Sequence, residues 1–122
     1  MNIAIVGATG NVGRIILEVL EKKNFEVENL YLLASQKSQG SNLKFNGREI
    51  KVESLDNFDF SKVNLSFFSA GGKISEKFAA KAAKNSLVID NSSFFRMDPE
   101  VPLIVPQVNS NHMEKVPKNI IA

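Results

Sequence analysis

Short apolar runs alternate with amphipathic segments along this chain of 122 residues. The apolar runs predict buried strands of a parallel sheet. These predicted strands are residues 2–6, 27–34, 63–69, 86–90, 103–105 and 119–122. Helices are predicted between them at 12–20 and 74–84, where apolar residues recur at helical spacing. The alternation predicts an α/β fold, a mostly parallel twisted sheet with helices on both faces.

The first predicted helix has a clear apolar stripe. Its hydrophobic positions are Val12, Ile15, Ile16, Val19 and Leu20, with charged residues on the other side. We expect this stripe to be the face that packs on the sheet.

A hairpin is predicted between the second and third main strands. Asn46 and Gly47 separate two alternating segments, 43–45 and 48–52, and Asn-Gly is a strong hairpin signal. We interpret it as a small excursion with a structural role.

Three glycines follow the first strand at GxxGxxG spacing and open the first helix, in Gly7-Ala8-Thr9-Gly10-Asn11-Val12-Gly13. This arrangement predicts a dinucleotide site, where backbone N–H groups and a helix N-terminus meet a pyrophosphate. Gly7 would allow the sharp turn, Gly10 the approach of the phosphates and Gly13 close packing of the helix on the sheet. The alternative is a glycine-rich turn kept only for packing.

The end of the second strand indicates which dinucleotide is bound. An NAD site places Asp or Glu there, whereas this chain has Ser35-Gln36-Lys37-Ser38. A 2′-phosphate favours a cation and hydroxyls, so NADP is predicted, with Lys37 as the charge and Ser35 and Ser38 as donors. A polar surface loop is the alternative for this segment.

Two later strands also end in small or polar residues. Ala70-Gly71-Gly72 follows one and Asn91-Ser92-Ser93 the other, and carboxyl ends of parallel strands meet at one edge of a sheet. Arg96 could grip a phosphate or carboxylate there, or form a surface salt bridge instead. His112, the one histidine, is interpreted as a surface residue and not as a base.

Length, composition and charge exclude several kinds of site and partner. The length predicts one domain, residues 1–122, and the absence of cysteine excludes disulfides, thiolate metal sites and a cysteine nucleophile within this chain. The net charge of +2 comes from dispersed lysines, which does not favour nucleic-acid binding. No basic leader or membrane-length apolar run is present, so we expect a cytoplasmic protein without a membrane partner.

Several of these motifs together closely resemble bacterial aspartate-semialdehyde dehydrogenases. The segments that carry the resemblance are 7–13, 33–40, 69–72, 88–98 and 105–109, in order along the whole chain. It implies a Rossmann-type NADP-binding domain of an enzyme that reduces β-aspartyl phosphate to aspartate semialdehyde and releases phosphate, in lysine, threonine and methionine biosynthesis.

The resemblance also implies roles for single residues. The pyrophosphate would lie on residues 9–12, Ala70 and Gly71 would flank the cofactor, Asn91 would lie near the nicotinamide, and Arg96 would hold the substrate phosphate. Lys37 and Gln107 depart from the family, where arginine and glutamate are usual.

The resemblance further implies a cysteine nucleophile and a catalytic histidine that this chain lacks. We therefore expect a fragment that binds cofactor without catalysis, truncated before the substrate and dimerisation domain of a homodimer or homotetramer. Two alternatives remain: N-acetyl-glutamyl-phosphate reductase, and a non-catalytic nucleotide-binding or assembly domain. The fragment interpretation predicts that the reading frame continues past Ala122 with a cysteine within a few codons.

Overall fold

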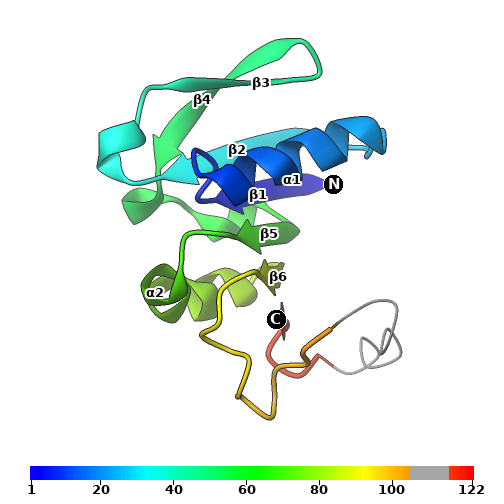
Figure 1. The fold of residues 1–122 in the computed structure, drawn as a ribbon, viewed down its shortest axis with the longest axis vertical. Helices are drawn as coiled ribbons and strands as arrows, with labels where there is room; N and C mark the ends of the chain where they lie inside the picture. The colour runs from blue at the N-terminus through cyan, green and yellow to red at the C-terminus, as the bar shows by residue number, and fades with distance from the viewer. Residues whose placement is uncertain (105–115) are drawn as a thin grey trace.

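The computed structural model describes residues 1–104 and 116–122. Within them a seven-stranded sheet has the order β3-β4-β2-β1-β5-β6-β7, and its other elements are two α-helices and short 3₁₀ turns (Figure 1). The elements are β1 (Asn2–Val6), α1 (Asn11–Lys22), β2 (Asn29–Ala34), β3 (Asn42–Phe45), β4 (Arg48–Ser54), β5 (Leu65–Phe68), α2 (Gly72–Ala83), β6 (Leu87–Asp90) and β7 (Ile120–Ile121). The α/β class and the mostly parallel sheet are confirmed.

The strand β1 lies at the centre of the sheet because it pairs in parallel with both β2 and β5. Its residues from Ile3 to Val6 are fully buried, as the continuous apolar run predicts. Parallel pairing continues from β2 to β4 and from β5 through β6 to β7, while β3 is antiparallel to β4. The carboxyl ends of the parallel strands therefore share one edge.

The two helices cover opposite faces of this sheet. Phe78, Ala79 and Ala82 of α2 belong to a core with Phe68 and Val88. On the other face, α1 packs through Leu17 and Leu20, in a separate core with residues of β1 and β2. Helices on both faces were predicted and are confirmed.

The hairpin is larger than predicted. Asn46 and Gly47 have positive φ angles of 50° and 79°, as a tight hairpin turn requires. However, β4 also pairs in parallel with β2, and Val52 is fully buried. The second arm of the hairpin is thus a strand of the main sheet and not an excursion from it.

The predicted strand at 103–105 is wrong in its described part. Residues 103 and 104 are not in a strand, although Ile104 N donates to Ala122 O at 3.0 Å. Val105, Gln107 and His112 lie outside the described residues. The strand predicted at the end of the chain is confirmed as β7.

The predicted inner face of the first helix is correct only in part. Leu20 is buried and Ile16 is partly buried against the core, as predicted. Val12, Ile15 and Val19 are instead 39%, 56% and 45% exposed, while Gly13 and Leu17 are buried. The inner face of the helix is therefore rotated from the predicted stripe toward Gly13 and Leu17.

Candidate functional site

The turn after β1 depends on Gly7. This residue has a φ of +88°, and a Cβ there would lie 2.9 Å from both the carbonyl carbon and oxygen of Ser69. The N–H groups of Gly7 and Ala8 donate to Leu33 O at 2.8 and 3.2 Å. The turn is therefore held between the ends of β2 and β5, and only glycine fits at its start.

Gly13 and Gly10 have different surroundings. A Cβ on Gly13 would lie 2.3 Å from Gly7 O and 2.8 Å from Ala8 Cα, so close packing is confirmed, but against the turn. A Cβ on Gly10 would meet a single atom, Gly7 O at 3.4 Å. The protein thus leaves space on one side of Gly10, where a ligand can approach the backbone.

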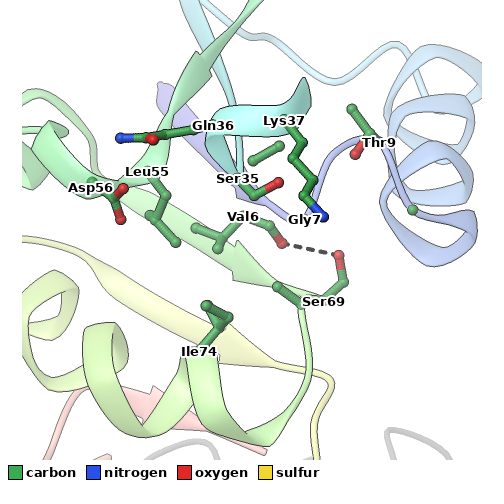
Figure 2. A pocket seen from close by; sticks show the side chains of 13 residues that line it. Val6, Gly7, Thr9, Ser35, Gln36, Lys37, Leu55, Asp56, Ser69 and Ile74 are labelled. Carbon is green, nitrogen blue, oxygen red and sulfur yellow. Dashed lines mark hydrogen bonds between the residues drawn. The ribbon is translucent and has the colours of Figure 1, made fainter. Parts of the chain in front are cut away.

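A cavity of about 700 Å³ lies beside this turn. Val6, Ala34, Leu55 and Ile74 give it apolar walls, contributed by β1, β2, α2 and the turn after β4 (Figure 2). The polar groups around it come from the glycine turn, from the segment that follows β2, and from Asp56 and Ser69, which follow β4 and β5. Apolar walls with a few polar groups suit a ring system with a charged tail.

Two helix N-termini meet at this cavity. Gly10, the N-cap of α1, lines the cavity. Ala70 and Ile74, which lie on either side of the N-cap of α2 at Gly71, line it as well. Neither cap has a side-chain hydrogen bond, and neither first turn carries an acidic residue. The positive ends of both helix dipoles are therefore available to an anion such as a pyrophosphate.

Hydroxyl and ammonium groups follow the end of β2. Thr9 Oγ1 donates to Ser38 Oγ at 3.4 Å, which links the glycine turn to the segment after β2. Lys37 lines the cavity, and in Figure 2 its ammonium end points toward the glycine turn. Asp56 also lines the cavity, but it lies beyond Leu55, on the opposite side from Thr9 (Figure 2). The Lys37 ammonium group and the Asp56 carboxylate therefore lie in different parts of the cavity.

Comparison with known proteins agrees with this geometry. The family described as semialdehyde dehydrogenase, NAD binding domain, matches residues 2–116. The chain belongs to this family. The chain is 47% identical to aspartate-semialdehyde dehydrogenase 2 of Vibrio cholerae over 99% of its own length and 36% of that protein. The corresponding figures for the Aquifex aeolicus enzyme are 49%, 95% and 35%.

Solved structures of the semialdehyde dehydrogenase family share the fold. Aspartate semialdehyde dehydrogenase II of Vibrio cholerae superposes with a TM-score of 0.96 at 47% identity, over 99% of this chain and 37% of that one. The Candida albicans enzyme, solved with NADP, gives 0.79 at 25% identity, over 98% and 41%. The chain spans little more than a third of the length of the curated relatives it matches.

The structure brings together about half of the site residues predicted for a semialdehyde dehydrogenase. Six of them line the cavity: Gly7, Thr9, Gly10, Ser35, Lys37 and Ala70. Ser38 does not line the cavity but accepts a hydrogen bond from Thr9, which does. Asn11 and Val12 lie at the N-terminus of α1, and Gly71 lies at that of α2. Asn91 and Arg96 are exposed in the segment after β6 and do not line this cavity.

Sequence reasoning missed seven residues that line the cavity: Val6, Ala34, Gln36, Leu55, Asp56, Ser69 and Ile74. Leu55 and Asp56 follow β4 directly, at the carboxyl edge of the sheet. Because β4 was interpreted as part of an excursion, the rule that ligands bind at carboxyl ends was not applied to it. Recognising β4 as a parallel strand would have found both residues.

The segment that carries Asn91 and Arg96 is anchored by a buried carboxylate. Asp90 is 2% exposed and accepts hydrogen bonds from Ser75 Oγ at 2.8 Å, Ser92 N at 2.9 Å and Ser92 Oγ at 2.8 Å. Charge-assisted bonds of this kind are strong. They fix the start of this segment against the first turn of α2, and so against one wall of the cavity.

Searches for other kinds of site cover residues 1–104 and 116–122. No group of three or more His, Cys, Asp or Glu side chains in that part could hold a metal ion. In the same residues, no helix has the length and apolar character to cross a membrane.

Proposed function

We propose that this chain is the NADP-binding part of an aspartate-semialdehyde dehydrogenase, which reduces β-aspartyl phosphate to aspartate semialdehyde with NADPH and releases phosphate. The observation that carries the proposal is a single cavity with the glycine turn on one side and the Ser35–Ser38 segment on the other. Relatives that carry this enzyme name at 47 to 49% identity support it.

The pyrophosphate would lie at the N-terminus of α1, on Thr9, Gly10, Asn11 and Val12. The space beside Gly10 and the absence of acidic residues from the first turn support this placement. Ala70 and Gly71, where α2 begins, would flank the cofactor from the other side.

NADP in place of NAD is supported by charge. The adenosine ribose would lie beside Lys37, Ser35 and Ser38, and the segment from 35 to 38 contains no carboxylate. A 2′-phosphate would gain from the Lys37 ammonium group. The NADP-bound Candida albicans relative supports the same cofactor.

Substrate chemistry would use the loop after β6. Arg96 is exposed and offers two parallel hydrogen bonds to a substrate phosphate, and Asn91 would lie near the nicotinamide. The family resemblance implies a thiolate nucleophile, and this chain contains no cysteine. The chain alone therefore binds cofactor without reducing substrate. The complete enzyme would be a cytoplasmic homodimer or homotetramer.

Titration of the purified chain with NADPH, followed by the cofactor's fluorescence, tests the proposal. We expect saturable binding, with weaker binding of NADH. Absence of a saturable signal at millimolar NADPH would refute a formed cofactor site.

The variant Lys37→Glu tests the cofactor choice. Reversing this charge should weaken NADPH binding at least tenfold, about 1.4 kcal/mol, while NADH binding changes little. Lys44→Glu is the matched control, because Lys44 is an exposed lysine on β3 that does not line the cavity. Equal effects of the two variants on NADPH binding would show that net charge, and not position, is responsible.

A further inference from the structure

Among the described residues, Asp56 is the only carboxylate that lines the cavity beside the glycine turn. Its backbone is held in place, because its N–H donates to Ser54 Oγ at 3.3 Å in the short 3₁₀ turn Leu55–Asn57. Its side chain is exposed, and within residues 1–104 and 116–122 no group donates to its carboxylate or forms an ion pair with it. The position of Asp56 is thus fixed, and its two oxygens can accept hydrogen bonds from a ligand.

The order of the strands indicates which half of a dinucleotide would lie beside Asp56. Along the sheet the strands β4, β2, β1, β5 and β6 are neighbours in that order, and the glycine turn follows the central strand β1. The proposed place of the 2′-phosphate is after β2, and that of the nicotinamide is near Asn91, after β6. Asp56 follows β4, which lies beyond β2 on the side away from β6. The adenosine half of the cofactor would therefore lie on its side of the sheet.

The ends of β2 and β4 lie level with each other. Ala34 and Ser54 are partners in the parallel register, so the chain leaves both strands at the same height. Neighbouring strands are about 4.8 Å apart. A base that extends past a ribose beside Ser35 and Lys37 would therefore reach Asp56, two residues after the end of β4.

The walls in this part of the cavity suit a flat aromatic base. Ala34 and Leu55, which are 6% and 5% exposed, line the cavity with Ile74. Figure 2 shows Leu55, Asp56 and Gln36 at the side of the cavity away from Thr9. Apolar walls contact the faces of a ring system, and a few polar groups at its edge fix its orientation. Asp56 can supply such a polar group, because it directly follows the apolar residue Leu55.

The chemistry of a carboxylate selects one kind of purine edge. A carboxylate accepts hydrogen bonds and does not donate them. The only N–H groups on the adenine ring of a nucleotide are those of the 6-amino group, which would donate to Asp56. Hypoxanthine carries an oxygen at this position, so two hydrogen-bond acceptors would face each other and remain unpaired. A site built to pair with an amino group discriminates against an analogue that lacks it.

We propose that Asp56 is a specificity-determining residue of the cofactor site, whose carboxylate accepts a hydrogen bond from the 6-amino group of adenine and disfavours a purine with oxygen at that position. The inference rests on the proposed function, because it concerns the base of the same NADP molecule. It is separate from the choice between NADP and NAD, which depends on the 2′ position of the ribose.

The test compares NADPH with reduced nicotinamide hypoxanthine dinucleotide phosphate, which differs from NADPH only at the base. Both carry the same charge and the same fluorescent dihydronicotinamide, so one kind of titration with the purified chain measures both Kd values. The ratio of these values cancels any general effect of a variant on the charge of the site. The variants are Asp56→Asn, whose amide can turn its N–H₂ toward an oxygen, and Asp56→Ala. The matched control is Asp59→Asn, because Asp59 is an exposed carboxylate that does not line this cavity.

The parent chain should bind the hypoxanthine cofactor about tenfold more weakly than NADPH, as expected for one hydrogen bond to a charged group. Both Asp56 variants should bring the two Kd values within about threefold of each other, while Asp59→Asn keeps the parent ratio. The Asp56 variants should also melt within about 2 °C of the parent, because this side chain is exposed.

Equal binding of the two cofactors by the parent would overturn the inference without any variant. A ratio that both Asp56 variants leave unchanged would also overturn it, and so would a ratio that Asp59→Asn lowers to the same extent. Failure of the proposed function is distinguishable, because the parent would then show no saturable binding of NADPH itself, and the inference would fail with it.

Discussion

Alanine in place of Gly13 tests whether the glycine turn and α1 form a single close-packed unit. Its Cβ would lie 2.3 Å from Gly7 O and 2.8 Å from Ala8 Cα. Ordinary contacts of this type begin near 3.4 Å, so α1 must move by about 1 Å from the turn. Both neighbours are backbone atoms, and no flexible side chain can move aside instead.

Two opposing terms set the size of the effect. Alanine gains about 1 kcal/mol over glycine from helix propensity. Forcing a well-packed contact apart costs about 1–3 kcal/mol and more where backbone must shift, so the upper end applies here. We expect a net loss of about 1–2 kcal/mol, which for a domain of this size lowers Tm by about 4–8 °C.

Thermal unfolding and NADPH titration measure the two consequences. The shift of α1 away from the turn should also weaken NADPH binding at least tenfold. Gly10→Ala is the contrasting variant: its φ of −78° and ψ of 171° suit alanine, and its Cβ meets Gly7 O alone, at 3.4 Å. It should keep the parent Tm and lose NADPH affinity. A Gly13→Ala chain as stable as the parent would refute the reasoning.

Two further predictions concern the carboxylates of Asp90 and Asp98. Asp90→Asn removes the charge of a carboxylate that accepts from Ser75 Oγ and from the N–H and Oγ of Ser92, and it replaces one of the two accepting oxygens with an N–H₂ donor. Urea unfolding should therefore show a loss of about 1–3 kcal/mol; an unchanged midpoint would contradict this. Lys118 donates to Asp98 at 2.8 Å and holds the pKa of that carboxyl below its ordinary 3.8. The bond therefore stabilises the fold above pH 3.8 and is lost as pH falls below it. Lys118→Met should lower Tm slightly at pH 6 and not at pH 2, and an equal effect at both would contradict the assignment.

The sequence was sufficient to predict the central strand β1 and the glycine turn that follows it. The run from Ile3 to Val6 has no polar position, and such a run is stable only where both faces are covered, so a central parallel strand followed directly. The Gly7 to Gly13 spacing predicted a sharp turn and a close approach, and both are present in the geometry. The signals for both features lie within residues 3–13, so they can be recognised in a single sequence although the contacts that they make reach Leu33 and Ser69.

Strand pairing between residues far apart in the sequence could not be predicted from such local signals. Whether β4 ends in the hairpin or also joins β2 depends on a contact between Val52 and Leu32, twenty positions apart. Alternation along 48–52 is equally compatible with both arrangements. The side of the cavity formed by Leu55 and Asp56 was missed for the same reason.

The rotation of α1 shows how one steric contact can override a hydrophobic pattern. Periodicity placed Val12, Ile15 and Val19 inward, but only a glycine can approach the Gly7 turn closely enough to close it, and Gly13 lies on another side of the helix. The turn therefore fixes the rotation of the helix, and Leu17, which the predicted stripe did not include, joins Leu20 as an inner apolar residue. The same glycine that packs against the turn thus leaves Val12, Ile15 and Val19 exposed on α1.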